Sequence, residues 1–301
     1  MTRVLRKFSN GVAVLGVTAL LAVCQSTAPS PSTSGSGQPK PQATSQTAPV
    51  TPAAYAAPTA VPRGRSVLVL NGYTGRELLS ENADAPRFPA SLTKMMTLYL
   101  LFEEVSKGRY TLSTPLNVSA NAASQPPSKI GLKPGSTITV EQAARALAIK
   151  SANDVAIAVA ENISGSEAAF ARKMTQKAKS LGLTRTRFVN ASGLPNPRQV
   201  TTARDMAKLG MALKRRFPQY ASYYKARSVT YNGRRFKATN NLIGKVAGVD
   251  GLKTGYVRLS GYNLVATSRR NGRKLVVVVM GGASESARDT EVTQLIERFS
   301  Y

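Results

Sequence analysis

The chain has 301 residues, of which 41 are Lys or Arg and 15 are Asp or Glu, and it contains no histidine and a single cysteine. The lack of histidine excludes a Ser-His-Asp triad, a Cys-His dyad and histidine-ligated zinc, and the single cysteine excludes an internal disulfide, a Cys-x-x-Cys redox motif and a four-cysteine zinc site. Any general base must therefore be Lys, Asp, Glu or Tyr, and the net charge of +26 predicts a surface that attracts polyanions such as nucleic acid, anionic lipid or an acidic wall polymer.

Residues 1–24 have the pattern of an export signal. Arg3, Arg6 and Lys7 precede an apolar run over residues 11–23, which is shorter than the about 20 residues that span a bilayer. The sequence Leu21-Ala-Val-Cys24 resembles a bacterial lipobox in which Cys24 would be lipidated, although its Val departs from the small residue expected there. Lipidation and ordinary signal-peptidase cleavage both stay open. We expect a periplasmic or other cell-envelope protein, free or attached to a membrane through residues 1–24.

Residues 25–62 are dominated by Pro, Ser, Thr, Ala, Gln and Gly and carry one charge, Lys40. This composition buries too little apolar surface to offset chain entropy, so it predicts a disordered linker. The folded domain is predicted over residues 63–301, which hold 37 basic and 15 acidic residues.

The secondary-structure pattern of the folded part changes along the chain. Strands at residues 66–70 and 77–79 with a turn between them predict a hairpin. Helices are predicted over residues 91–105, 139–148, 153–162, 166–181 and 202–216, the second with a capping-box pattern from Thr139 to Gln142. Strands follow at residues 228–231, 261–268 and 274–280, and a helix at residues 286–299 closes the chain. This order predicts an α+β fold in which an antiparallel sheet is built from both chain ends around a helical block.

Ser91-Leu-Thr-Lys94 is an S-x-x-K motif at the predicted start of a helix. Residues three apart share a helix face, so Lys94 can take the proton of the Ser91 hydroxyl if burial and other cations lower its pKa. The helix N-terminus favours the developing anion. An isolated motif of this kind usually marks only a solvated helix lysine, and Ser222-Tyr-Tyr-Lys225 has the same pattern.

The order of motifs along the chain distinguishes the S-x-x-K motif at Ser91 from the one at Ser222. Ser91 is followed by Ser151-Ala-Asn153, an S-x-N motif, and then by Lys253-Thr254-Gly255, which occurs once. The trio S-x-x-K, S-x-N and K-T-G is typical of penicillin-binding proteins and class A β-lactamases. Ser222 has no S-x-N between itself and the K-T-G. Asn153 could alternatively be a helix N-cap.

Together these residues resemble the low-molecular-mass penicillin-binding proteins that act as serine D-alanyl-D-alanine carboxypeptidases. The resemblance runs from about Arg63 to Tyr301 and includes further matching segments: Phe88-Pro-Ala-Ser-Leu-Thr-Lys94, Gly131-Leu-Lys-Pro-Gly135, Ser192-Gly-Leu194, Gly261-Tyr-Asn-Leu264 and Met280-Gly-Gly282. It implies a β-lactamase/penicillin-binding-protein-like transpeptidase fold. Many members carry a C-terminal β-rich domain with a membrane helix. Because this chain stops at Tyr301, we expect neither here.

The resemblance also implies an activity and a role for each matching residue. The terminal D-Ala of peptidoglycan stem peptides would be removed through an acyl-enzyme on Ser91, with Lys94 as its base and no metal or organic cofactor, and β-lactams would inhibit. Ser151 and Asn153 would relay protons and hold the substrate amide. The backbone N–H groups of Ser91 and Tyr256 would form the oxyanion hole. The remaining residues would bind substrate, with Arg288 holding its carboxylate: Lys253, Thr254, Gly255, Tyr256 and Arg288. Tyr256 departs from the His that the family often has.

Three other functions are weighed against this one. A D,D-endopeptidase would use the same residues on cross-linked peptides. A class A β-lactamase needs a Glu between the second and third motifs, yet no Asp or Glu occurs between Glu167 and Asp205. A basic wall-binding protein without activity would not need the trio. Tyr223 and Tyr224 beside cations could stack on nucleic acid, but an exported protein does not normally meet it, so no nucleic-acid partner is expected.

Overall fold

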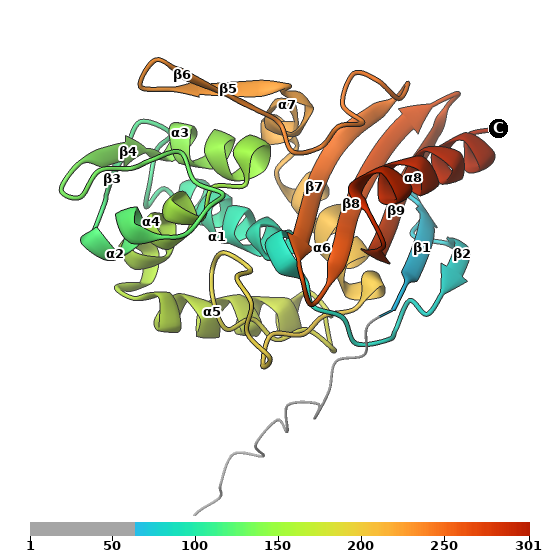
Figure 1. Ribbon diagram of the computed structural model, residues 1–301, viewed down its shortest axis with the longest axis horizontal. Coiled ribbons are helices and arrows are strands. Elements are labelled where there is room, and N and C mark those ends of the chain that lie inside the picture. Colours follow the sequence, from blue (N-terminus) through green and yellow to red (C-terminus); the bar gives the residue numbers. More distant parts are fainter. Residues whose placement is uncertain (1–63) are drawn as a thin grey trace, which may run out of the picture. The chain divides into compact units, whose positions relative to one another are not determined.

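The computed structural model describes residues 64–301, so the signal and linker predicted for residues 1–24 and 25–62 lie outside the described residues, as does Arg63. Five antiparallel strands form the main sheet, in the order β2-β1-β9-β8-β7. Their bounds are β1 Ser66–Asn71, β2 Glu77–Glu81, β7 Val249–Val257, β8 Gly261–Arg270 and β9 Arg273–Gly282. The predicted sheet from both chain ends is confirmed, since β1 pairs directly with β9 (Figure 1).

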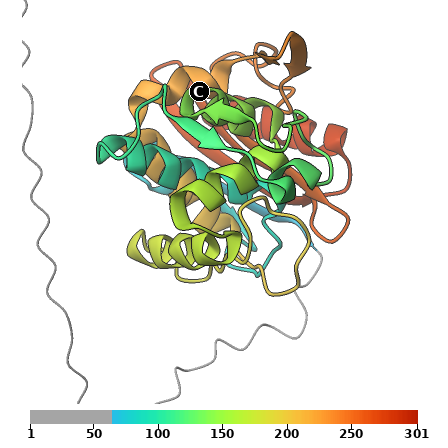
Figure 2. The same ribbon diagram turned by 90° about the vertical axis from the view of Figure 1, so that its left-hand side faces the viewer.

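The inserted block contains a helix in each of the five predicted segments and two short helices that were not predicted, α2 and α7. Their bounds are α1 Lys94–Ser106, α2 Ala120–Ser124, α3 Val140–Arg145, α4 Asn153–Ser164, α5 Glu167–Ser180, α6 Ala203–Arg216 and α7 Ala221–Lys225. The capping box of Thr139 with Gln142 forms as expected. Two small antiparallel pairs of strands accompany the block: β3 Pro115–Asn117 with β4 Thr137–Thr139, and the hairpin of β5 Ser228–Tyr231 with β6 Arg234–Lys237. Figure 2 shows the helices in front of the sheet.

Side chains of the sheet alternate between two cores, as the period of two of a strand requires. Leu275, Val277 and Val279 of β9 pack in one cluster with α8 (Glu285–Phe299). Val276 and Val278, which point the other way, belong to the larger cluster of the helical block. The sheet is therefore covered by helices on both faces, which positions its outer strand β7 against the helical block.

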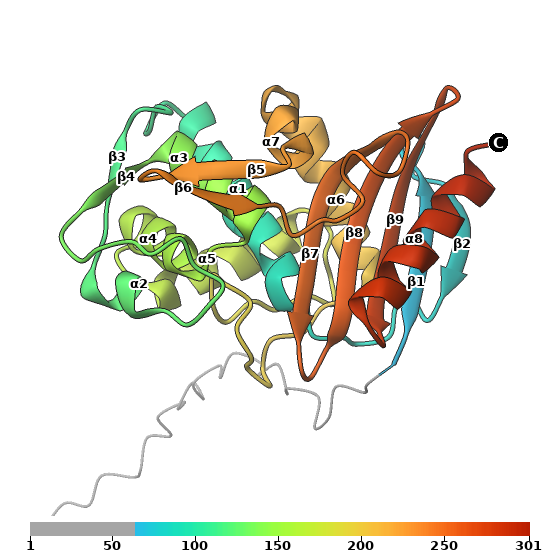
Figure 3. The same ribbon diagram turned by 45° about the horizontal axis from the view of Figure 1, so that its top comes forward.

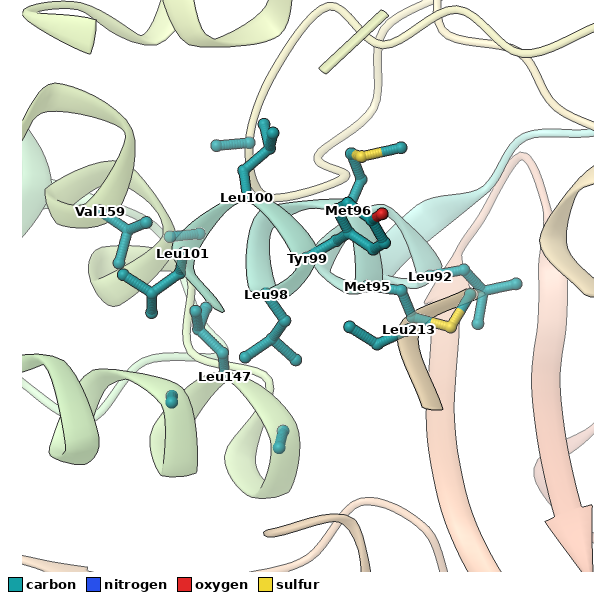
Figure 4. Close-up of a cluster of buried hydrophobic side chains, with 14 of the residues drawn as sticks. Leu92, Met95, Met96, Leu98, Tyr99, Leu100, Leu101, Leu147, Val159 and Leu213 are labelled. Atoms are coloured by element: carbon teal, nitrogen blue, oxygen red, sulfur yellow. The ribbon is translucent and has the colours of Figure 1, made fainter. Parts of the chain in front are cut away.

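Helix α1 lies at the centre of the large cluster (Figure 4). Its residues from Lys94 to Glu104 are all buried, as is typical of a helix surrounded by other elements on all sides. Its carboxylates Glu103 and Glu104 are 3% exposed and are each paired with two cations from α5 and the loop after α1. Burial on all sides holds the first turn of α1 in a fixed position.

Three local predictions differ from the structure. The first helix begins at Lys94 rather than residue 91, after a 3₁₀ turn over Ala90–Thr93. The predicted helix 139–148 ends at Arg145 and continues as a π-helical turn, Ala146–Lys150. The K-T-G segment lies on a strand of its own, β7, which escaped detection because its glycines and Lys interrupt the apolar, β-branched pattern of a strand. Among residues 64–301, no helix is long and apolar enough to cross a membrane.

Candidate active site

Ser91 and Lys94 stand at the point where the 3₁₀ turn becomes helix α1. Residues three apart lie one above the other in a 3₁₀ turn, and Lys94 Nζ is 3.1 Å from Ser91 Oγ. The turn is held from behind by Asn263 of β8, whose Nδ2 donates to the carbonyl oxygen of Phe88 at 3.1 Å. The Ser91 side chain lines a pocket, whereas Lys94 is fully buried behind it.

The other contacts of the Lys94 amine determine how it can act. Lys94 Nζ donates to Asn153 Oδ1 at 2.7 Å and to the carbonyl oxygen of Ser192 at 2.5 Å. The amide of Asn153 is oriented by its own Nδ2, which donates to the Pro126 carbonyl. Both partners of the amine are acceptors only. In its neutral form the amine would use its two hydrogens on these acceptors, which would leave its lone pair for the Ser91 hydroxyl hydrogen.

Burial is the main reason that Lys94 can be neutral. Complete burial lowers the pKa of Lys94 well below its ordinary value, and the positive charge of Lys253 lowers it further. The carboxylate of Asp154 acts in the opposite direction and raises it. These are the conditions under which a lysine serves as a general base near neutral pH.

Lys253 on β7 is a second buried lysine. Its side chain is 1% exposed, and Nζ donates to the carbonyl oxygen of Thr254 at 2.8 Å. Burial, followed by the charge of Arg288, lowers the pKa of Lys253 to about 7. Lys253 is thus no ordinary lysine at the edge of a strand, and its charge changes within the physiological range.

Ser151 has an unusual backbone conformation at the end of the π-helical turn, with φ 64° and ψ 40°. This left-handed conformation is costly for a residue with a Cβ and is typical of functional sites. Ser151 is 5% exposed, and its Oγ has no hydrogen-bond partner among the described residues. Ser151 lines the pocket, and its hydroxyl oxygen is buried with its hydrogen-bonding capacity unused.

Asn153 opens helix α4, but the N-cap of this helix is Ala152. The alternative in which Asn153 serves as an N-cap is therefore wrong. Its side chain instead contacts Lys94 and Pro126 from the first position of the helix.

A pocket of about 540 Å³ joins the three motifs. Seven of the nine predicted site residues line it: Ser91, Ser151, Asn153, Thr254, Gly255, Tyr256 and Arg288. The other two, Lys94 and Lys253, are buried in its walls. The S-x-x-K and S-x-N motifs come from the helical block and the K-T-G from β7, so the pocket lies between the block and the edge of the sheet.

The backbone on both sides of Ser91 is suited to hold an oxyanion. β7 is the outer strand of the sheet, and the Thr254 carbonyl accepts from a side chain, Lys253 Nζ. Because alternate residues of a strand turn their backbone groups to the same side, the Tyr256 N–H faces away from β8 as well. A Cβ on the intervening Gly255 would lie 3.1 Å from the backbone nitrogen of Ser91. Glycine here lets the two N–H groups converge on one point.

Arg288 and Thr254 are both in the pocket wall. The guanidinium of Arg288 donates to Asp289 Oδ1 from Nε at 3.0 Å and from Nη2 at 2.6 Å. Its Nη1 is 3.4 Å from the carbonyl oxygen of Asn263. Thr254 Oγ1 donates to Thr239 Oγ1 at 2.8 Å. Arg288 is thus held rigidly by a carboxylate beside it, with its position in the wall defined before any substrate arrives.

Residues 53–284 match the family profile described as D-alanyl-D-alanine carboxypeptidase. The chain belongs to this family. Among curated relatives, it is 35% identical over 237 residues to the D-alanyl-D-alanine carboxypeptidase DacF of Bacillus subtilis, an alignment that covers 77% of this chain and 61% of the relative. It is 36% identical over 238 residues to DacA of Escherichia coli, with 77% and 59% covered. The chain thus spans about three fifths of the length of these relatives.

Solved structures of the carboxypeptidase family and its neighbours have the same fold. Penicillin binding protein 5 of Haemophilus influenzae superposes with a TM-score of 0.75 at 31% identity, covering 83% of this chain and 72% of the other. The α+β transpeptidase fold predicted from the sequence is confirmed.

Three residues of this carboxypeptidase-family site were not predicted as functional. Asp154 is fully buried, and its carboxylate accepts the N–H groups of Ile130, Gly131 and Leu132 at 2.9–3.3 Å. It follows Asn153 directly, which was the available signal. The other two are Ser192, whose carbonyl holds Lys94, and Asn263, which supports the nucleophile turn. Both occur in segments that carried the family resemblance, but backbone and supporting roles leave no residue-type signature.

Proposed function

We propose that this protein is a serine D-Ala-D-Ala carboxypeptidase that works through an acyl-enzyme on Ser91. The observation that carries the proposal is the position of the fully buried Lys94 amine, whose Nζ lies 3.1 Å from Ser91 Oγ. Family membership and the match to curated carboxypeptidases support the same reaction.

The proposed reaction has two steps. Ser91 Oγ attacks the carbonyl carbon of the penultimate D-Ala while Lys94 takes the hydroxyl proton. The oxyanion is held by the N–H groups of Ser91 and Tyr256. The C–N bond then breaks, the proton passes to the nitrogen of the leaving D-Ala, and Ser151 Oγ is available to relay it. In the second step, water hydrolyses the ester and releases the shortened peptide.

The terminal carboxylate of the substrate is proposed to bind at Thr254 and Arg288, with Lys253 and Gly255 shaping the same wall. Arg288 lines the pocket, and Asp289 fixes its guanidinium through Nε and Nη2. A carboxylate there would complete a charge-assisted set of hydrogen bonds.

β-Lactams are proposed to acylate the same serine. Penicillin-Binding Protein D2 of Listeria monocytogenes, solved in its ampicillin-bound form, superposes with a TM-score of 0.67 at 29% identity and covers 78% of this chain and 96% of the other. The D,D-endopeptidase alternative shares every residue of this site, and activity on cross-linked peptides separates the two.

The test is intact mass spectrometry after incubation with penicillin. The parent protein should gain one penicilloyl group, and Ser91→Ala should gain none. Ser222→Ala is the matched control, because Ser222 begins the second S-x-x-K of the chain, and it should label as the parent does. Label on another serine in the Ser91→Ala variant would overturn the assignment, and a parent that never labels would leave the non-catalytic alternative.

We further propose, from sequence alone, that residues 1–24 direct export to the periplasm or outer envelope. Cys24→Ser separates the two routes of processing. A lipoprotein would remain unprocessed or be released as soluble protein, whereas ordinary signal cleavage would leave its distribution unchanged.

A further inference from the structure

Two hollows of about 670 and 650 Å³ meet at the loop between β6 and β7. They share Arg227 and Ile243 in their linings and lie on either side of residues 240–248. Figure 3 shows the β5–β6 hairpin lying across the helical block and leading through this loop into β7. The two hollows together are called the basic groove below.

Positive charge is concentrated in the basic groove. Eight cations line it: Lys214, Lys225, Arg227, Arg235, Lys237, Lys245, Arg269 and Lys274. The lining contains one acid, Asp250, whereas residues 63–301 as a whole have 37 cations for 15 acids. The ratio of basic to acidic residues is therefore far higher in the groove lining than in the whole domain.

The single acid does not neutralise this charge. Asp250 is already paired with Lys214 at 2.5 Å. Within residues 64–301, no carboxylate lies within 4 Å of the other seven cations. Burial is the main cause of the lowered pKa of Lys214, and the charges of Lys274 and Lys225 lower it further against the effect of Asp250. The cations of the groove repel one another, and an anion bound among them would relieve that repulsion.

Part of the groove is rigidly constructed. Arg227 Nη2 donates to the carbonyl oxygen of Gly244 at 3.3 Å. A Cβ at Gly244, where φ is +73°, would lie 2.7 Å from the guanidinium, so another residue there would strain the backbone and displace the Arg227 head group. Arg235 Nε donates to Ser228 Oγ at 2.9 Å. Asn240, which also lines the groove, is 9% exposed and its Nδ2 has no partner among the described residues.

The groove and the active-site pocket are separated by only one short segment. Lys237, Ala238 and Asn240 line the groove. Thr239, between them, lines the active-site pocket and accepts from Thr254 Oγ1. The pocket and the groove are therefore adjacent, on the two sides of this segment.

We propose that the basic groove binds the acidic remainder of a polymeric wall substrate, namely the carboxylate-bearing peptides that surround the one being cut. This inference rests on the proposed function. A flat anionic membrane would not enter two concave hollows. Single-stranded nucleic acid is usually held by aromatic rings as well as charge, and the linings contain no Phe, Tyr or Trp. The position of the groove next to the active-site pocket favours the substrate itself.

The test compares a polymer with a short peptide. A variant with Arg227→Gln, Arg235→Gln, Lys237→Gln and Lys245→Gln removes four exposed cations. D-Ala release from purified peptidoglycan should fall about tenfold at low salt and lose most of its salt dependence, because a cleft of one charge accelerates encounter by that order. The kcat/KM for diacetyl-L-Lys-D-Ala-D-Ala should stay within about twofold, since the short peptide does not reach the groove.

A second variant distinguishes the effect of the groove cations from the effect of a lower net charge on the protein. Arg172→Gln, Lys179→Gln, Arg198→Gln and Arg298→Gln remove four exposed cations that line none of these pockets. This variant should keep the parental rate on peptidoglycan. An equal loss in both variants, or no loss in the groove variant, would overturn the proposal.

Binding is measured separately from turnover. Co-sedimentation of Ser91→Ala with peptidoglycan should weaken when the four groove substitutions are added, whether or not the parent hydrolyses short peptides. If the parent fails on short peptides, the proposed function fails while this binding result still decides the groove. Loss of binding to phosphatidylglycerol vesicles or to an oligonucleotide, with peptidoglycan binding unchanged, would overturn the proposal in favour of those partners.

Discussion

Two lysines are almost completely buried beside the same pocket, and the charge of Lys253 lowers the pKa of Lys94. Lys94 and Lys253 are 0% and 1% exposed, and neither has a carboxylate partner within 4 Å in the described part of the chain. The free energy of keeping two cations out of water is therefore not recovered by ion pairing. The consequence of this burial is a lowered pKa, and a lysine that loses its proton easily can act as a general base.

Lys253→Met should stabilise the fold at neutral pH. The pKa of Lys253 is about 7 in the folded state, against 10.5 for the ordinary side chain. Between pH 7 and pH 10.5 the unfolded chain therefore binds one more proton than the folded protein. The loss of folding stability caused by Lys253 is complete below pH 7 and absent above pH 10.5. We expect a gain of about 2–4 kcal/mol in the free energy of unfolding at pH 7.

Urea denaturation at several pH values measures this gain. It should shrink as the pH rises from 7 towards 10.5, and penicillin labelling should be impaired throughout. Lys179→Met, at an exposed position of α5, is the control and should show no such trend. A variant that is less stable than the parent at pH 7 would contradict the argument.

Asp154→Asn should move the pH profile of acylation downwards. A neutral Lys94 is required, so the acylation rate rises as the pH passes through its pKa. Asp154 raises that pKa, and an amide does not. The rising limb should therefore shift to lower pH, as measured by stopped-flow acylation across the pH range. A shift to higher pH, in protein shown by circular dichroism to be folded, would refute this electrostatic role.

At the scale of elements, the loop that ends at Leu194 holds the nucleophile turn and its base together. The Ser192 carbonyl accepts from Lys94. Next to it, a Cβ at Gly193 would lie 1.9 Å from the carbonyl oxygen of Ala90. Glu167 of α5 fixes this loop by accepting the Ala191 N–H at 2.9 Å. The loop, the 3₁₀ turn and helix α5 thus form one packed unit around Ser91.

Gly193→Ala should abolish acylation, because backbone lies where the methyl group would go and φ is +84°. Gly182→Ala is a matched control with φ +74° and nothing within 4 Å of its Cβ. It should lose about 1 kcal/mol of stability from backbone strain and keep the parental rate of penicillin labelling. Labelling by Gly193→Ala at the parental rate would show that the close contact does not position Ser91.

At the scale of the whole domain, the site exists only where two parts of the fold meet. Ser91 and Asn153 belong to the helical block, and the opposite wall is the edge strand β7 of a sheet that includes both chain ends. One acidic residue of the described part, Glu285, lines the pocket, and it lies 3.6 Å from Arg288. The walls offer few groups that could activate a water molecule against a bound ester.

The penicilloyl ester should therefore persist for minutes or longer, whereas a competent enzyme turns over about 10 times per second. The opened ring keeps the leaving amine in the site, where it obstructs water. Timed mass spectrometry after stopped-flow acylation measures the release. Glu285→Gln should release at the parental rate. Rapid multiple turnover of penicillin would replace the carboxypeptidase assignment with a β-lactamase.

Much of the domain was determined locally in the sequence. The hairpin of β1 and β2, the capping box at Thr139 and the helices α4, α5, α6 and α8 follow from periodicity, caps and turn residues, which act between neighbours in the chain. The order of the three motifs also predicted which residues would line one pocket.

Tertiary structure alone decided the electrostatics of that pocket. Burial of Lys94 depends on elements far along the chain, and a pKa is lowered only once water is removed from all sides. The close contact of Gly193 with the Ala90 carbonyl likewise arises from packing against backbone that is distant in the sequence. Local patterns could not reveal these features, because Lys94 and its partners Asn153 and Ser192, like Gly193 and Ala90, are distant in the sequence and come together only in the folded domain.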